Sequence, residues 1–226
     1  MTAPVAGTAH TDVPELGFAV SGPRPEQFAA VPTLRFDLDV ERLGGPAVSA
    51  ASLTVDIRID VTRRAYPPRA HRALAEIFGV PGEWARSMRP LAWTQITVQV
   101  PRVEATARLP LTVGCGIDTE LAVTRYLRAV GDEPVPLAFL FTGTLFYRPG
   151  RAAGPLLTAR VPWSAECDGT LPAGLWQDLV ERYYGDAPWL RLTRETYDRL
   201  DAHRVRHVLP GPEAAVTDLI DRSGAP

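Results

Sequence analysis

The sequence predicts an α+β fold, in which an antiparallel β-sandwich or partly open barrel of about seven strands precedes a helical C-terminal third. Segments that alternate apolar and polar residues recur up to about residue 162, and the period becomes helical after Trp163. The strands also follow one another without regularly intervening helices, which favours antiparallel pairing. We expect a disordered segment at 1–15 and a single domain over 16–226, β-rich over 16–162 and helical over 163–222.

The clearest strand is residues 53–61, where Leu, Val and Ile alternate with Thr, Asp and Arg. Residues 34–40 alternate in the same way, so both segments are expected to be half-buried strands. Between residues 74 and 78 the spacing is helical and ends at Gly79, and a short helical turn is expected at 83–88.

Further strands are expected after this helix, and the last of them lies at about 156–161. Pro110 lies inside an alternating segment at 105–113, which argues for an edge strand. Residues 135–147 are apolar on both faces, as in a central buried strand. The segment 121–127 is compatible with either a strand or a helix. The remaining strand is expected at 96–100.

Three helices are expected after Trp163. Pro172 suits the first turn of one helix, and five apolar residues follow it at helical spacing: Leu175, Trp176, Leu179, Val180 and Tyr183. Thr193 is a plausible N-cap for a second helix, and Pro212 opens a third.

All 24 basic residues are Arg, because the chain contains no Lys, and it also contains no Asn. A P-loop NTPase, a pyridoxal enzyme and a protein kinase each need a Lys, so these three classes are excluded. The net charge of −2 and the absence of a basic block argue against nucleic-acid binding. No cofactor is expected.

The N-terminus shows no secretory signal, and no segment reaches the ~18 apolar residues of a transmembrane helix. We therefore expect no membrane span and a cytoplasmic bacterial protein. In that compartment Cys115 and Cys167 stay reduced.

His203 and His207 are four residues apart, so on a helix they share one face and could supply two metal ligands. The alternative is a solvated last turn, where basic side chains suit the negative end of the helix dipole. A third and a fourth ligand would have to come from elsewhere in the chain, and Cys115 or Cys167 could supply them. The chain has no C-x-x-C motif, which is a common source of paired zinc ligands.

Cys115 lies between two glycines after a strand, where a nucleophile could be presented with His71 as a distant base. A small buried cysteine at a strand end is the alternative. The acidic residues of the first two strands, Asp37, Asp39, Asp56 and Asp60, would form cross-strand ion pairs with Arg35 and Arg58 if those strands pair. No G-x-S-x-G motif supports a serine hydrolase.

Aromatic residues concentrate in the helical third. Most of them should pack helices against the sheet, but a surplus would form an exposed patch of the kind that binds proteins. The candidate partner-binding residues are Trp176, Tyr183, Tyr184, Trp189 and Tyr197.

Five segments together resemble a domain-of-unknown-function family of high-GC Gram-positive bacteria: residues 24–36, 88–94, 139–146, 161–163 and 189–196. They extend over nearly all of residues 18–220. Members of that family are often encoded beside genes of the high-affinity [NiFe] uptake hydrogenase. The resemblance therefore implies an accessory role, with hydrogenase subunits or maturation factors as partners, and it supplies no catalytic residues.

The sequence thus leads us to expect a non-enzymatic accessory or partner-binding protein. A metal-handling protein that uses His203 and His207 is one alternative, and a protein with a small-molecule or lipid pocket between sheet and helices is another. The patterning leaves homo-oligomerisation open.

Overall fold

The computed structural model describes residues 13–115, 121–131, 133–149, 154–185 and 192–224. The chain divides into two compact units, Met1–Asp186 and Ala187–Pro226, which are described separately. The expected organisation as a single domain over 16–226 stays a prediction. Most of the segment expected to be disordered lies outside the described residues, and the first strand begins at its last residue, Glu15.

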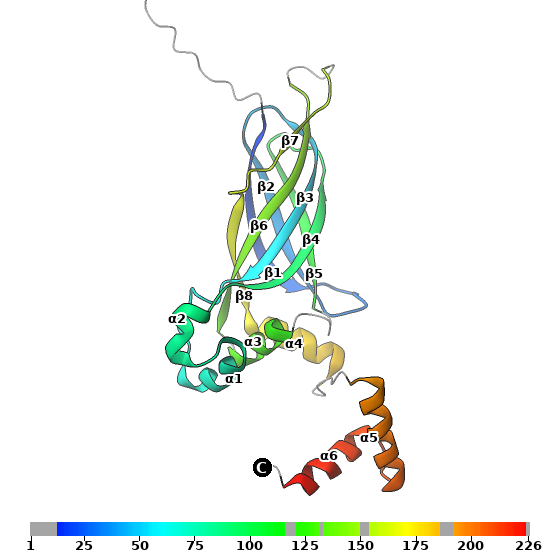
Figure 1. Cartoon of the computed structure of the whole chain (residues 1–226). Helices are drawn as coiled ribbons and strands as arrows, with labels where there is room; N and C mark the ends of the chain where they lie inside the picture. Colours follow the sequence, from blue (N-terminus) through cyan, green and yellow to red (C-terminus); the bar gives the residue numbers. More distant parts are fainter. Residues whose placement is uncertain (1–12, 116–120, 132, 150–153, 186–191, 225–226) are drawn as a thin grey trace, which may run out of the picture. The chain divides into compact units, whose positions relative to one another are not determined.

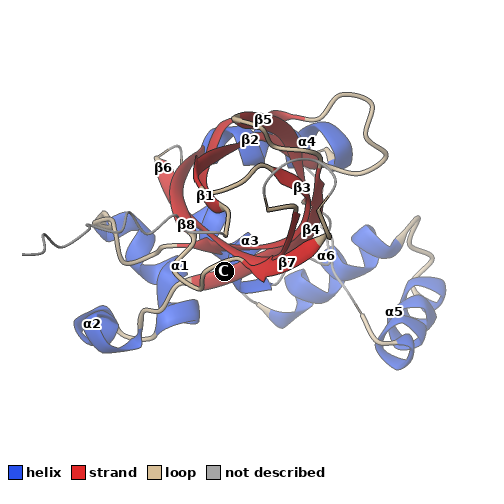
Figure 2. Ribbon diagram, turned by 90° about the horizontal axis from the view of Figure 1, so that it is seen from above, coloured by secondary structure: helices blue, strands red, loops and turns tan. Residues whose placement is uncertain are grey.

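The first unit contains two antiparallel sheets. One has the order β1-β2-β5, formed by β1 (Glu15–Pro25), β2 (Thr33–Gly44) and β5 (Thr106–Gly114). The other has the order β4-β3-β6-β7, with β8 also paired to β6; its strands are β3 (Val48–Ile59), β4 (Leu91–Val100), β6 (Pro134–Tyr147), β7 (Leu157–Arg160) and β8 (Glu166–Pro172). The strands surround a common interior without closing into a barrel, which confirms the predicted α+β class (Figure 2).

The helices of the first unit are α1 (Pro68–Phe78), the short 3₁₀ turn η1 (Pro81–Glu83), α2 (Trp84–Ser87), α3 (Leu121–Ala129) and α4 (Ala173–Tyr184). They gather at one end of the strands, where α3 contacts α1, α4 and β4 (Figure 1). The helix expected at 74–78 is confirmed, and the ambiguous segment 121–127 is helical. In the described residues no helix is long and apolar enough to cross a membrane.

Alternation of apolar and polar residues places the core between the sheets. On β2 the buried residues are Leu34, Phe36, Leu38 and Val40, and on β3 they are Leu53, Val55, Ile57 and Ile59. Strand β6 lies at the centre of its sheet, as its apolar sequence predicts, and β3 lies between β4 and β6. Strand β5 pairs with β2 alone among the described strands, so Pro110 lies on an edge strand as expected.

Two strands were not predicted. β1 contains Gly22 and Pro23 at a register shift, and β8 contains Gly169 and ends at Pro172, so neither has the β-branched alternation typical of a strand. The helical region therefore begins at Ala173 and not directly after Trp163.

Helix α4 packs its predicted apolar stripe against the core. Trp176 and Leu179 are buried, and Leu175, Val180 and Tyr183 are half-buried against the same cluster. Pro172 occupies the N-cap position, one residue before the helix begins.

The second unit contains α5 (Arg194–Arg206) and α6 (Pro212–Ser223). The Thr193 hydroxyl accepts a hydrogen bond from the Thr196 N–H, which confirms the predicted N-cap. Pro212 opens α6, also as expected. Among the described residues of this unit, Ala215 alone is buried, so the two helices have almost no apolar core of their own.

Candidate functional site

The predicted partner-binding aromatics have different environments. Trp176 is 3% exposed in the core, and Tyr183 is half-buried with its hydroxyl donating to the Ala29 carbonyl at 2.7 Å. Tyr184 ends α4, and Tyr197 is exposed on α5. Trp189 lies outside the described residues. These five side chains are therefore not shown to form one patch, and their role in partner binding stays a prediction.

His203 lies in the last turn of α5 and His207 is the C-cap residue that follows it, and their ring centroids are 4.4 Å apart. His203 Nε2 is 2.7 Å from Asp218 Oδ2 on α6, and Arg222 donates to the same oxygen at 2.8 Å. These two partners lower the pKa of the Asp218 carboxyl. Arg222 also lies 3.3 Å from His207 Nδ1, so the cluster links α5 to α6.

This histidine cluster does not provide a complete metal site. Within the described part of the chain, no group of three or more His, Cys, Asp or Glu side chains is arranged to hold a metal ion. Cys115 and Cys167 belong to the first unit. The use of His203 and His207 as metal ligands stays a prediction.

Cys115 fits the alternative of a buried structural cysteine. Its side chain is 3% exposed, and burial raises the pKa of the thiol to about 12. Burial also raises the pKa of the half-buried Cys167 to about 11. A nucleophilic cysteine needs a lowered pKa, so the environment of Cys115 opposes that role.

The predicted acidic residues form ion pairs, but not on one shared surface. Asp37 and Asp39 lie on β2 and Asp56 on β3, in two different sheets, so the strand pairing on which the shared surface depended does not occur. Asp56 pairs with Arg58 on its own strand at 2.7 Å. Asp60 is buried, and its Oδ1 accepts from both the Thr62 hydroxyl and the Thr62 N–H.

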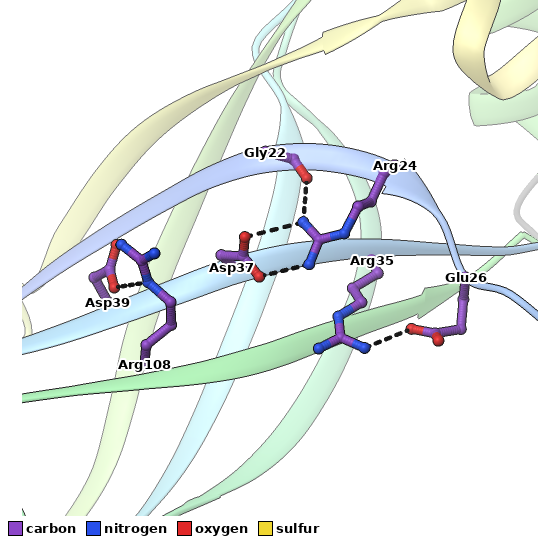
Figure 3. Close-up of polar contacts among 7 residues, drawn as sticks. All are labelled: Gly22, Arg24, Glu26, Arg35, Asp37, Asp39 and Arg108. Atoms are coloured by element: carbon purple, nitrogen blue, oxygen red, sulfur yellow. Dashed lines mark hydrogen bonds and ion pairs between the residues drawn. The ribbon is translucent and has the colours of Figure 1, made fainter.

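A row of ion pairs follows the outer face of the β1-β2-β5 sheet (Figure 3). Arg108 pairs with Asp39 directly opposite on β2 at 2.6 Å, and Arg24 pairs with Asp37 through two hydrogen bonds. Each arginine lowers the pKa of its aspartate. The row continues with Arg35 and Glu26, which are 3.4 Å apart. Glu26 is also the first residue of the loop between β1 and β2.

That loop, residues 26–32, is named here the Phe28 loop. It lies at the end of the sandwich where α1 to α4 gather (Figure 1). Phe28 is fully exposed, and Val31 is exposed beside it. Such a fully exposed phenylalanine is informative only if the chain holds it in place, because mobile surface apolar residues are common.

The Phe28 loop is held at both ends and in its middle. The Glu26 N–H donates to the Thr33 carbonyl at 2.8 Å, and the Cys115 N–H donates to the Pro32 carbonyl at 2.7 Å. Tyr183 of α4 holds the middle through its bond to the Ala29 carbonyl. Tyr183, which the sequence predicted as a binding residue, therefore stabilises the conformation of the loop.

Phe28 has a left-handed backbone, with φ of 60°. For a bulky residue this conformation costs about 1–2 kcal/mol, which the bonds that anchor the loop must offset. Since the ring is fully exposed, it buries no apolar surface in the described fold that could offset this strain. A strained and exposed aromatic residue of this kind is typical of a functional position.

Trp163 is the second large aromatic at the surface, with 93% of its area exposed. It lies in the turn between β7 and β8, which is closed by a bond from the Ala165 N–H to the Pro162 carbonyl at 3.0 Å. The Ala165 carbonyl also accepts from the Phe141 N–H on β6 at 2.8 Å, so this turn is anchored to the sheet.

No local sequence pattern indicates the environments of Phe28 and Trp163, because each depends on tertiary contacts. Both residues lie in segments that carry the family resemblance, 24–36 and 161–163, but the resemblance assigns them no role. The available local signal was proline, which is typical of turns and loops: Pro25 and Pro32 flank the segment that contains Phe28, and Pro162 precedes Trp163.

Another candidate is a hollow in the second unit beside α6. It is lined by polar and small residues: Pro210, Gly211, Glu213, Ala214, Thr217, Asp218 and Asp221. This lining is not the apolar pocket between sheet and helices that the small-molecule alternative requires, and that alternative stays a prediction.

The half-buried Tyr66 and the buried Tyr126 of α3 form a pair in the first unit. Tyr66 donates to the Val61 carbonyl at 2.7 Å, and its oxygen lies 2.9 Å from that of Tyr126. Burial raises the pKa of both hydroxyl groups. They therefore stay protonated at neutral pH and link α3 to the segment after β3.

The model of a family of unknown function, DUF6084, matches residues 13–226. The chain belongs to the DUF6084 family. A comparison of this DUF6084 chain with curated proteins finds no significant match.

Among solved structures, the DUF6084 chain is similar to a CARDB domain from Pyrococcus furiosus, solved in complex with di-metal ions. The identity is 12% and the TM-score 0.25, over 66% of this chain and 93% of that one. A β-glucosidase from Erythrobacter marinus is 14% identical, with a TM-score of 0.21, over 65% of this chain and 15% of the enzyme. β-Glucosidase 3B from Thermotoga neapolitana is 10% identical, with a TM-score of 0.22, over 70% of this chain and 17% of the enzyme. Likenesses at these TM-scores carry no argument about function.

Proposed function

We propose that this DUF6084 chain is a non-enzymatic accessory protein that binds a protein partner. The observation that carries the proposal is the fully exposed Phe28, held in a strained conformation on an anchored loop. Aromatic residues contribute most to binding when they are rigidly presented, since less conformational entropy is lost on association.

Trp163 supports the same function through its exposure on an anchored turn. Tryptophan is enriched among the residues that dominate binding energy at protein interfaces. Both aromatics project from a sheet sandwich with a continuous apolar core, which supplies a rigid scaffold.

The sequence resemblance makes components of the [NiFe] uptake hydrogenase the first partners to test, in the bacterial cytoplasm. The experiment is affinity purification of the tagged chain from its own host, with the co-eluting proteins identified by mass spectrometry. We expect hydrogenase subunits or maturation factors to be enriched over a purification with an unrelated tagged domain. If no protein is enriched, the proposed partner-binding function is wrong. If proteins other than hydrogenase components are enriched, the partner-binding function stands and the hydrogenase association is wrong.

A further inference from the structure

Three carbonyl groups of the Phe28 loop accept hydrogen bonds within the protein, whereas several of its N–H groups donate none to the described residues. The carbonyls of Ala29 and Pro32 accept from Tyr183 and from the Cys115 N–H, and the Val31 carbonyl accepts from the Thr33 hydroxyl at 2.9 Å. The N–H groups of Phe28, Ala30 and Val31 donate no hydrogen bond to any residue that the structure describes.

An unpaired N–H group must meet an acceptor wherever it loses contact with water, because burying it unpaired is costly. Any surface that covers Phe28 would also cover part of this loop. The partner therefore needs an apolar pocket for the ring and acceptors at the pocket's edge for the N–H groups.

The charged groups beside the loop limit the partner further. Glu26 is paired with Arg35, and Arg24 with Asp37, so the base of the loop presents charges that are already neutralised. Recognition by one strongly charged surface is therefore not favoured at this position.

We propose that the Phe28 loop is the interface with a folded partner protein, whose apolar pocket takes the Phe28 ring and whose carbonyl or carboxylate oxygens accept from the Phe28, Ala30 and Val31 N–H groups. The inference rests on the proposed partner-binding function and names the surface and the partner chemistry. The loop is the rigid half of the interface, because Tyr183 and the Cys115 N–H fix its conformation before binding.

The test uses the full-length chain and the protein that it retains in the affinity purification, identified and purified separately as the probe. Affinity is measured by calorimetry for the wild type, Phe28→Gly and Leu43→Ala. Phe28→Gly should weaken binding at least about 30-fold, as for a dominant interface residue. Leu43→Ala is the matched control, since it removes another exposed apolar side chain near the end of β2 that is remote from the loop, and it should change affinity less than about threefold.

The Phe28→Gly variant also separates binding from folding. Glycine adopts positive φ without strain, so this variant should unfold at a temperature equal to or above that of the wild type while binding is lost. Hydrogen exchange should show the amides of Phe28, Ala30 and Val31 protected in the complex and unprotected in the free chain.

The outcomes distinguish the two proposals. If the wild type binds its probe and Phe28→Gly binds equally well, the assigned surface is wrong and the partner-binding function stands. If the affinity falls but the three amides stay unprotected in the complex, the assigned partner chemistry is wrong. If the wild type retains no protein, the proposed function fails, and the inference fails with it.

Discussion

Val208 occupies a backbone position that glycine normally takes. The Val208 N–H donates to the Val205 carbonyl at 3.2 Å and the Leu209 N–H to the Arg204 carbonyl at 3.0 Å, which is the Schellman arrangement at the end of α5. Val208 has a φ of 55° and is 89% exposed. The Val208 side chain thus strains the backbone at this positive φ and buries almost no apolar surface in the described fold.

Val208→Gly should therefore stabilise the end of α5, by about 1 kcal/mol, because the Cβ penalty of the left-handed conformation disappears. Hydrogen exchange of the α5 amides measures the change, since it reports local opening. Val208→Ala keeps a Cβ at the same φ and should give a clearly smaller gain. Equal gains for Gly and Ala would contradict the strain argument.

Cys115 should be nearly inert to thiol reagents in the native protein. With a pKa of about 12, its thiolate is a minute fraction at pH 8, and the side chain is buried. In a Cys167→Ser background, labelling at pH 8 should be at least about 100-fold slower than in denaturant. The rate should rise with pH, since the pKa is raised and deprotonation increases towards it. Fast labelling at neutral pH would instead revive the nucleophile hypothesis.

At the scale of elements, the pairing of β3 with β6 depends on Gly143. Its φ is 150°, and a Cβ at this position would overlap with the Ser52 carbonyl oxygen on β3. The Gly143 carbonyl also accepts from the Val161 N–H, where the chain leaves β7. The residue therefore lies where three segments of one sheet meet.

Gly143→Ala should destabilise the sandwich by about 3 kcal/mol or more, because the overlap is with backbone and neither central strand can shift freely. Thermal or denaturant unfolding measures this. Gly114→Ala is the matched control at the end of β5, where an added Cβ meets nothing within 4 Å, and it should be nearly neutral. If both variants were equally stable, the close approach of β3 and β6 at Gly143 would be wrong.

Elements with a strong local pattern could be predicted from the sequence, and those set by tertiary contacts could not. β3 alternates from Ala51 to Ile59 and α4 carries a full apolar stripe, so both follow from periodicity. β1 and β8 contain Gly and Pro and are strands because β2 and β6 provide partners for them. The register shift at Gly22 is tied by Arg24, whose guanidinium donates to the Gly22 carbonyl and to Asp37. No sequence pattern predicts this contact.

The candidate site was less predictable than the fold for the same reason. Composition directed attention to the aromatics after residue 163, and Tyr183 does belong to the site, but as a support for the Phe28 loop. Phe28 itself has neighbours in sequence that are ordinary for a loop. Its exposure and positive φ arise from anchors at Thr33, Cys115 and Tyr183, which are distributed over the first unit.

At the scale of the whole molecule, the core cluster that the described residues form lies within the first unit. Every residue of the core cluster precedes residue 180. The helices α5 and α6 bury Ala215 alone among their described residues and are connected by polar contacts such as His203 to Asp218. A chain of this size with so little buried apolar surface cannot offset its own conformational entropy.

A fragment of residues 13–185 should therefore fold by itself, and a fragment of residues 187–226 should not. The first should show a cooperative thermal transition and a near-ultraviolet circular dichroism spectrum from its packed aromatics. The second should show mostly unfolded backbone in far-ultraviolet circular dichroism, because isolated helices of this length are marginal in water. A fragment 187–226 that folds cooperatively alone would contradict the inference that its polar contacts are too weak to hold it.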